Sequence, residues 1–300
     1  MANPFCSVQS ICRLLDYSPQ AYHQQQKRVL KKQVNEDLMV QQIHLIRKHQ
    51  PMCGGRKLFI MLQSFFNTQN IQIGRDAFFD VLAKNKLLVR PHKRRVSTTN
   101  SRHHFRRFPN LAKDFKPMKA HELWVSDITY IPLKERFAYL FLITDAYSRK
   151  IVGFYVSDDM KVSSAVVALK KALLQKPIDT IVIHHSDRGI QYCSTEYVAL
   201  LQEHHALISM TQSGDPLENA IAERVNGILK TELISAYYNS VDEAALHISR
   251  CIIIYNYKRR HSSLNYQIPN DVHLQKGPQI RRWKNYYKTP KSKEVILQET

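Results

Sequence analysis

Hydrophobic positions recur with a helical period in the first part of the chain. Up to about residue 85 they return every three or four residues, as in helices that bury one face. This pattern predicts five helices, at residues 7–15, 18–22, 34–49, 56–66 and 74–85. The first two are short and joined by a tight turn, which fits either a helix-turn-helix or a plain helical hairpin. The last two fit a small helical bundle.

From about residue 120 the pattern changes to short apolar runs that alternate with helical segments. The runs predict strands at residues 123–131, 137–144, 150–156, 180–185 and 207–211. The intervening patterns predict helices at residues 163–175, 194–205, 215–233 and 241–255. Three strands in succession indicate an antiparallel meander, and the alternation that follows predicts a mixed α/β sheet.

Basic segments border this α/β region on both sides. From Val81 to Lys113 the chain has no acidic residue but ten lysines and arginines. Such a linker is either solvated or lies along a phosphate backbone, where its charges give sequence-independent affinity. The arginines expected to contact DNA there are Arg94, Arg95, Arg106 and Arg107. The predicted organisation is a helical region at 1–88, a basic linker at 89–119, an α/β core at 120–272 and a basic tail at 273–300.

The composition narrows the choice of partner. The 300 residues include 44 lysines and arginines against 25 aspartates and glutamates, a net charge of +19. This excess favours a polyanion such as nucleic acid over a membrane surface. The five cysteines form no C-x-x-C pair, which argues against a zinc site and a disulfide framework. Without a signal peptide or a long apolar run, we expect a cytoplasmic protein that acts on DNA.

Three carboxylates stand out as candidate chemistry. Asp127 lies in the middle of an apolar strand, L-W-V-S-D-I-T-Y-I, where a lone carboxylate is costly to desolvate. Asp187 ends another apolar run, in I-V-I-H-H-S-D-R-G. A bound cation would compensate such charges. Each acid also has a plain interpretation: Asp127 as a strand-end residue hydrogen-bonded to the backbone, Asp187 as the start of a turn with Gly189, and Glu223 as an exposed helix residue.

The third carboxylate, Glu223, belongs to the predicted helix at 215–233. Asp215 is a candidate N-cap, with Glu218 three residues later as in a capping box. One face of this helix carries the apolar residues Leu217, Ile221, Val225 and Ile228. The opposite face carries a polar row, with Glu223 among Asn219, Asn226 and Lys230.

These segments resemble the three acidic motifs of a known family. W-V-S-D-I-T-Y, H-S-D-R-G-I-Q-Y and N-A-I-A-E-R-V-N-G-I-L-K-T-E are similar to those of DDE transposases with a retroviral-integrase-like core. They are most similar to the second reading frame (OrfB) of the insertion-sequence-three family. Y-N-Y-K-R-R-H-S-S-L-N-Y-Q-I-P, at 255–269, resembles its closing motif. The resemblance covers roughly residues 7–272. It implies a ribonuclease H-like integrase core with a five-stranded mixed sheet, preceded by an all-α helix-turn-helix region.

The resemblance also implies a mechanism and its residues. Asp127, Asp187 and Glu223 would hold two Mg²⁺ ions, with Mn²⁺ as a substitute, for DNA cleavage and strand transfer at the ends of an insertion sequence. The residues expected to contact the DNA end are Lys230, Asn219, Gln191 and Tyr192. The chain departs from the family where Arg224-Val225-Asn226 replaces the usual Ser-Phe-Phe.

The implied partners are double-stranded DNA, as terminal inverted repeats and as target, and further copies of the chain assembled on it. In the resembling family an upstream reading-frame product (OrfA) is fused by frameshifting and is a further expected partner. Two other classes remain open. A DNA-binding regulator derived from a transposase explains the charge but not the three acids. A ribonuclease H-type nuclease explains the acids but not the helices at the front. His184 and His185 could alternatively bind a transition metal or lie in the core.

Overall fold

A computed structural model describes residues 7–89, 108–212, 216–235 and 237–279. The chain divides into two compact units, Met1–Arg95 and Val96–Thr300, and each is described by itself. The basic linker arginines predicted to contact DNA lie outside the described residues, as do Asp215 and most of the basic tail. None of the helices in the described parts has the length and apolarity needed to cross a membrane.

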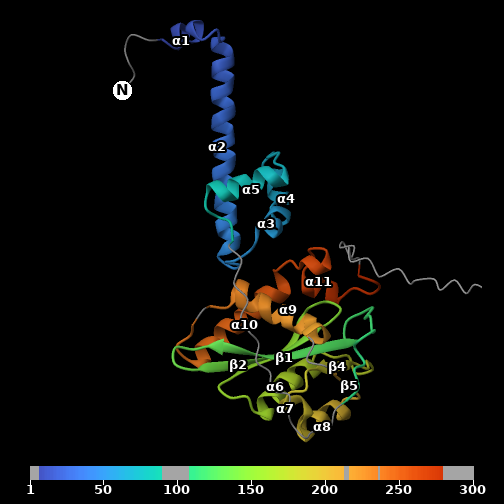
Figure 1. Ribbon diagram of the computed structural model, residues 1–300. Coiled ribbons are helices and arrows are strands. Elements are labelled where there is room, and N and C mark those ends of the chain that lie inside the picture. Colours follow the sequence, from blue (N-terminus) through green and yellow to red (C-terminus); the bar gives the residue numbers. More distant parts are fainter. Residues whose placement is uncertain (1–6, 90–107, 213–215, 236, 280–300) are drawn as a thin grey trace, which may run out of the picture. The chain divides into compact units, whose positions relative to one another are not determined.

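In the N-terminal unit, all the regular secondary structure of residues 7–89 is helical (Figure 1). Its helices are α1 (Val8–Leu14), α2 (Pro19–Arg47), α3 (Gly55–Met61), α4 (Gln63–Thr68) and α5 (Arg75–Lys84). Helices α3 to α5 pack on the second half of α2, where Ile43, Leu58, Phe66, Phe78 and Leu82 form a core. The first half of α2 projects beyond this core and is mostly exposed.

Helix α2 corrects the prediction of two separate helices at 18–22 and 34–49. It is one helix of 29 residues, because no glycine or proline between residues 20 and 47 interrupts it. Its predicted start is confirmed, since the Ser18 hydroxyl accepts a hydrogen bond from the Ala21 N–H at 3.1 Å and Pro19 is the first residue. The predicted helix at 56–66 is divided in turn, with Leu62 between α3 and α4.

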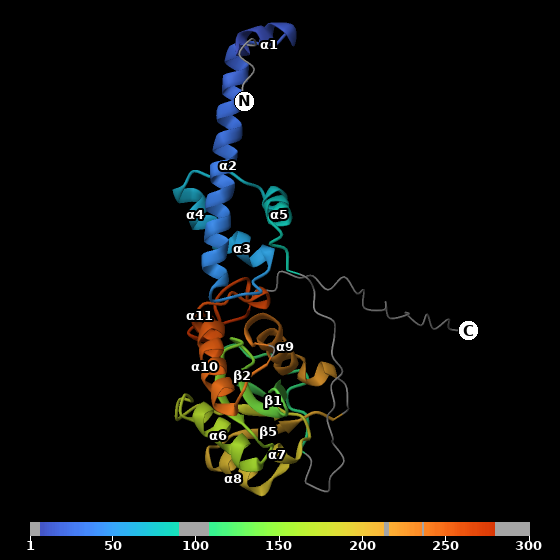
Figure 2. The same cartoon turned by 90° about the vertical axis from the view of Figure 1, so that its left-hand side faces the viewer.

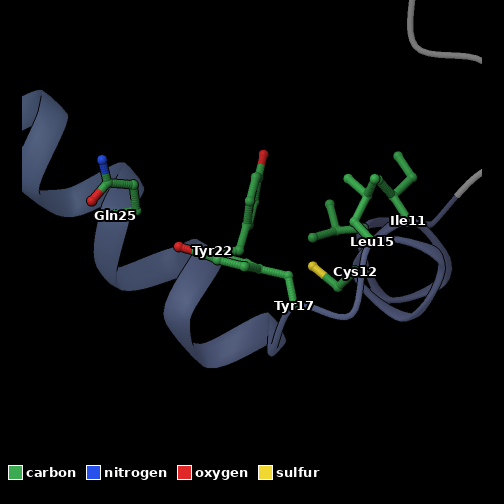
Figure 3. Close-up of a pocket in the computed structure, with 7 residues that line it drawn as sticks. Ile11, Cys12, Leu15, Tyr17, Tyr22 and Gln25 are labelled. Carbon is green, nitrogen blue, oxygen red and sulfur yellow. The ribbon is translucent and has the colours of Figure 1, made fainter.

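An apolar pocket of about 390 Å³ lies between α1 and the start of α2. Figure 3 shows the side chains of Ile11, Cys12, Leu15, Tyr17 and Tyr22 around it. Cys12 is buried, whereas Leu15 is 68% exposed. The contact between α1 and the start of α2 therefore has a much smaller core than the bundle formed by α3 to α5 and the second half of α2.

The C-terminal unit is built on a five-stranded sheet with the order β3-β2-β1-β4-β5. Strands β1 (Leu123–Pro132), β2 (Phe137–Asp145) and β3 (Ile151–Ser157) form an antiparallel meander. Strands β4 (Ile183–Ser186) and β5 (Leu207–Met210) run parallel to β1. The predicted mixed five-stranded α/β sheet is confirmed, although β4 begins three residues later than expected.

Helices cover both faces of this sheet (Figures 1 and 2). On one face lie α6 (Val162–Leu173), the short α7 (Ile190–Cys193) and α8 (Thr195–Glu203). On the other face lie α9 (Ala220–Ile228) and α10 (Val241–Tyr257). Alternate residues of β2 serve the two layers: Phe141 packs toward α6, and Leu140 and Leu142 pack toward α9 and α10. Because the central strands are buried on both faces, their sequences are nearly continuous runs of apolar residues.

The predicted helix at 215–233 is three different helices in succession. A 3₁₀ turn (Pro216–Asn219) leads into α9, and a π-helical segment (Leu229–Leu233) follows it. Glu218 accepts a hydrogen bond from the Gln212 N–H at 2.6 Å. The π segment is held by Arg259, whose guanidinium donates to both carboxylate oxygens of Glu232 at 2.8 and 2.9 Å. The unit ends with a 3₁₀ turn (Ser262–Leu264) and α11 (Pro269–His273).

Close packing of α6 on β3 requires a glycine at position 153. A Cβ there would overlap the Ala168 carbonyl oxygen and lie 2.8 Å from the Ala172 Cβ. We expect Gly153→Ala to lower the free energy of unfolding by roughly 1–3 kcal/mol, because helix and sheet must separate. Urea unfolding of the C-terminal unit measures this change.

Gly227→Ala is the matched control for that substitution. Gly227 lies inside α9, and a Cβ there meets nothing within 4 Å. This variant should be about 0.5–1 kcal/mol more stable than the wild type, from helix propensity alone. If Gly153→Ala unfolds like the wild type, the contact between α6 and β3 does not constrain the fold.

Candidate active site

Asp127 and Asp187 lie at the same level on neighbouring strands. Strands β1 and β4 pair in parallel with a constant offset of 60 residues, as in Val125 beside His185. The same offset carries Asp187, one residue past the end of β4, to the level of Asp127. Side chains alternate along a strand, so Asp127 shares the face of Val125, which packs against Ala222 of α9. Both carboxylates therefore project on the α9 side of the sheet and are partly buried.

The turn after β4 fixes the Asp187 carboxylate. Its Oδ1 accepts a hydrogen bond from the Gly189 N–H at 3.0 Å. A Cβ at Gly189 would lie 3.1 Å from that same oxygen, so a larger residue would crowd the acid. The turn interpretation of Asp187 and its interpretation as a site residue are thus compatible.

Two asparagines fasten α9 to β1 on either side of Glu223. The Asn219 amide donates to the Ser126 carbonyl oxygen at 2.9 Å. The Asn226 amide donates to Asp127 Oδ2 at 2.7 Å. Both side chains are buried, whereas Glu223 is exposed. Within the predicted polar row, the two asparagines therefore face the sheet, whereas Glu223 and Lys230 are exposed, and the charge of Glu223 acts on Asp127.

The electrostatics of Asp127 reflect this crowding of acids. Burial and the negative charge of Asp187 raise its pKa from the ordinary 3.8 to about 7, and the charge of Glu223 acts in the same direction. The hydrogen bonds from Asn226 and from the Ile128 N–H act against this shift. The three acids are therefore close enough to repel one another, and a cation between them would relieve that repulsion.

The donor set suits a hard divalent cation. In the parts of the chain that the structure describes, no three histidine, cysteine or acidic side chains form a ready-made metal cluster. Mg²⁺ does not require one, because it retains several waters and is commonly held by one or two carboxylates. Asp127 and Asp187, from adjacent strands, supply such a pair. The buried Oδ1 atoms of Asn219 and Asn226, which lack hydrogen-bond partners among the described residues, add oxygen acceptors close by.

The other candidates for DNA contact occupy varied positions. Tyr192 is buried in the core, with its ring 5.4 Å from that of Tyr197. The Gln191 amide donates to the Met160 carbonyl oxygen at 2.7 Å. Lys230 is exposed in the π segment, where the wider turn alters its alignment with Glu223. Buried Asn219 and Tyr192 offer little surface to DNA in this conformation, and DNA contact by all four residues stays a prediction.

Both histidines before Asp187 are core residues. His184 Nε2 lies 2.7 Å from the Ser126 hydroxyl and 2.9 Å from the Tyr197 hydroxyl. Burial lowers the pKa of His184 to about 3, so it is neutral. His185 lies 2.8 Å from the Ser209 hydroxyl and 3.0 Å from the Glu218 carbonyl oxygen. His185 thereby anchors the 3₁₀ turn that leads to Asn219.

Sequence reasoning missed the contact that Asn226 makes with Asp127. Its signal was present, because Asn226 follows Glu223 by one helical turn on the same face and departs from the resembling family. Asp145, the last residue of β2, is by contrast a turn residue: its carboxylate accepts hydrogen bonds from the Ser148 N–H at 2.8 Å and the His121 N–H at 2.7 Å.

The family of this chain is shown by its similarity to known proteins. Models of the integrase core domain match residues 117–216 and 204–269. The transposase of insertion sequence element IS904 from Lactococcus lactis is 31% identical over 251 residues, covering 82% of this chain and 97% of that protein. The chain belongs to the DDE transposases of insertion sequences, of the insertion-sequence-three type.

The chain is also similar to other proteins. An uncharacterized 31 kDa protein of insertion element IS600 from Shigella sonnei is 35% identical, covering 68% of this chain and 76% of that protein. Transposase InsF of insertion sequence IS3A from Escherichia coli is 37% identical over 41% of this chain and 43% of that protein. Among solved structures, the magnesium complex of the HTLV-2 integrase catalytic core is 19% identical with a TM-score of 0.42, covering 53% of this chain and 99% of that chain.

The raised pKa of Asp127 predicts a stability cost in metal-free buffer. Its folded pKa exceeds the unfolded one, so stability is present at low pH and is lost as pH rises from about 4 through about 7. The side chain in Asp127→Asn cannot ionise. The free energy of unfolding of this variant at pH 8 should therefore be roughly 1–3 kcal/mol higher than that of the wild type. The full pKa shift of Asp127 would correspond to about 4 kcal/mol, but we expect a smaller difference in stability because the site is partly open to solvent.

Urea unfolding in EDTA at pH 5 and pH 8 measures this difference, which should shrink toward pH 4. Asp158→Asn, at an exposed acid of the same unit, is the control. Equal stability of Asp127→Asn and the wild type at pH 8 would mean that the carboxylate is well solvated.

Proposed function

We propose that this transposase cleaves DNA at the ends of its insertion sequence and joins the freed ends to target DNA, using Asp127, Asp187 and Glu223 as its metal-binding acids. The observation that carries this proposal is the placement of the acids. Asp127 and Asp187 share a level and a face on adjacent strands, and two asparagines hold the helix of Glu223 against the same strand.

The cofactor is a divalent cation, in the form of two Mg²⁺ ions for which Mn²⁺ can substitute. When bound, such ions activate an attacking oxygen and stabilise a leaving oxygen in an in-line phosphoryl transfer. Asp127, Asp187 and Glu223 would hold these ions, and the charge of Asp127 interacts with both other acids. Oxygen ligands and an open, partly solvated site match the preference of Mg²⁺.

The surrounding residues keep these acids oriented. The Asn226 amide occupies one lone pair of Asp127 Oδ2, and the Ile128 N–H occupies Oδ1, which limits rotation of the carboxylate. The Gly189 N–H does the same for Asp187. No covalent protein intermediate is required, since water and then a DNA 3′-hydroxyl serve as nucleophiles.

DNA binding is divided between the two units in this proposal. The helical region 1–88 recognises the terminal inverted repeats, the basic linker 89–119 and tail 273–300 follow the phosphate backbone, and the core 120–272 carries out the chemistry. A net charge of +19 supports a polyanion as substrate. Copies of the chain assemble on DNA in the cytoplasm of a bacterial cell, with an OrfA-type upstream product as a further partner.

Neutralising each acid tests the chemistry. We expect Asp127→Asn, Asp187→Asn and Glu223→Gln each to reduce cleavage and strand transfer by a factor of at least about 10³, because each removes a ligand charge at nearly constant shape. DNA affinity should remain within about twofold. A gel assay with terminal-repeat DNA and Mg²⁺ measures both steps, and Asp158→Asn should retain full activity.

The same assay separates the rival functions. Cleavage without joining would indicate a nuclease, and binding without cleavage would indicate a regulator. Full strand transfer by any of the three variants removes that residue from the site, and activity in EDTA excludes the metal mechanism.

Separating the units tests the division of DNA binding. Residues 1–95 should prefer terminal-repeat DNA over random DNA by a factor of at least about 10, because each specific base contact contributes about 1–3 kcal/mol. Residues 96–300 should bind both DNAs nearly alike. Footprinting and anisotropy titrations measure these preferences, and equal binding of the two DNAs by residues 1–95 would place end recognition elsewhere.

A further inference from the structure

A short segment of the predicted basic linker lies along the edge of the sheet at β5, and we call residues 108–112 the edge strap. The Met210 N–H of β5 donates a hydrogen bond to the Pro109 carbonyl oxygen at 3.3 Å. Met210 pairs with Ser186 of β4, the residue before Asp187. The edge strap therefore meets β5 at the level of the acids, on the side of β5 that faces away from β4.

The edge strap is anchored on both faces of the sheet. Phe108 packs against the core that the sheet forms with α6 and α8, and this core includes Met210. Ala112 packs against a cluster on the opposite face, which contains Val125 of β1 and Ala222 of α9. The edge strap thus crosses the sheet edge within five residues and reaches the face on which the acids lie.

A chain of hydrogen bonds continues from the edge strap toward α9. The Leu111 N–H donates to the Ser209 hydroxyl at 2.8 Å, and that hydroxyl lies 2.8 Å from His185 Nδ1. His185 Nε2 lies 3.0 Å from the Glu218 carbonyl oxygen. The side chains of Ser209 and His185 are fully buried. They lie on the same face of the sheet as Asp187, because Asp187 follows His185 by two residues.

The chemistry of these groups gives the chain a direction. A carbonyl oxygen can only accept, so His185 Nε2 carries a proton and donates it to the Glu218 carbonyl oxygen. Burial lowers the pKa of His185, which keeps the ring neutral and makes Nδ1 an acceptor. The Ser209 hydroxyl then donates to Nδ1, while its oxygen accepts from the Leu111 N–H. Removing this hydroxyl would leave both the Leu111 N–H and His185 Nδ1 without these partners.

The chain of hydrogen bonds ends at the turn that precedes the helix of Glu223. Glu218 belongs to the 3₁₀ turn before α9, and Glu223 lies in the first turn of α9. A shift of the 3₁₀ turn would therefore move Glu223, whereas Asp127 and Asp187 would stay with their strands. The position of Glu223 relative to the two aspartates thus depends on the contacts that hold this turn.

We propose that the edge strap positions Glu223, and that Ser209 and His185 are the positioning residues that connect the strap to the helix of this acid. Where the basic linker joins the core, it then fixes the third acid of the site at which the DNA is cut. This inference rests on the proposed function, because the metal-binding role of Glu223 belongs to that function.

Protection of an exposed sheet edge would not by itself require these contacts. Strand β5 is the last strand of the sheet, and the backbone contact with Pro109 already occupies its edge. The buried side chains of Ser209 and His185 add a directed link from the edge strap to the turn before α9. Hydrogen bonds of this kind, one step behind a metal ligand, orient the ligand and tune the affinity for the metal.

The first test measures Mn²⁺ binding by the full-length protein without DNA, using electron paramagnetic resonance. Ser209→Ala cuts the chain at the strap, and His185→Asn keeps an acceptor for Ser209 but no longer reaches Glu218. Each variant should bind Mn²⁺ roughly tenfold more weakly than the wild type. The double variant should bind no more weakly than either single one, because both substitutions break the same chain.

Ser164→Ala is the matched control for these variants. It removes a buried hydroxyl of α6, which donates to the Ser157 hydroxyl at 3.0 Å on the other side of the sheet, and it should bind Mn²⁺ like the wild type. Unchanged Mn²⁺ affinity in Ser209→Ala would overturn the proposal, even with weaker binding by His185→Asn, since the turn would then be held without the strap. Additive losses in the double variant would also overturn it.

The second test follows the turn itself by amide hydrogen exchange of the full-length protein in EDTA. In Ser209→Ala and in His185→Asn, the amides of residues 216–223 should exchange roughly tenfold faster than in the wild type, because the turn opens more often. The amides of α6 and α10 should exchange at wild-type rates. Unchanged exchange at residues 216–223 would overturn the proposal, as would faster exchange throughout the unit. With variants at two positions, the test remains possible if one of them does not fold.

The two tests separate this inference from the proposed function. A failure of the proposed function would appear as Mn²⁺ binding that does not depend on Asp127 or Glu223, or as strand transfer in EDTA. Hydrogen exchange at the turn needs no metal and reports on the edge strap in either case. Mn²⁺ binding that depends on the acids, with wild-type affinity and exchange in Ser209→Ala, would refute the role of the edge strap alone.

Discussion

The carboxylate of Asp127 inside a buried strand is the constraint on which the site depends. Its neighbours Trp124, Val125 and Ser126 are buried, so the strand is fixed by packing on both faces. A charge held there is close to two other acids and costs stability unless a cation or a proton compensates it. The apolar cores between the helices and the two faces of the sheet stabilise the fold and offset this cost.

The second organising feature is the attachment of α9 to β1. A helix carrying Glu223 could slide or rotate on the sheet, because apolar contacts alone are not directional. Two amide hydrogen bonds, from Asn219 and Asn226, remove that freedom on either side of the acid. His185 extends the same attachment to the 3₁₀ turn before α9, and the Arg259–Glu232 pair holds the π segment after it. The position of Glu223 is thus determined from both ends of its helix.

The sequence by itself predicted five strands in a mixed α/β sheet, because period-two and period-3.6 patterns are local properties. Its motifs carried the resemblance to the family and nominated the three acids. Hydrophobic periodicity missed that residues 19–47 form one helix, although the sequence already shows that no glycine or proline interrupts this stretch. The sequence could not show that residues 216–233 change from 3₁₀ to α to π, since that outcome depends on tertiary contacts such as Arg259 with Glu232. It could not reveal that Asn226 binds Asp127, because these residues are 99 apart in the chain and only the packing of helix on sheet brings them together.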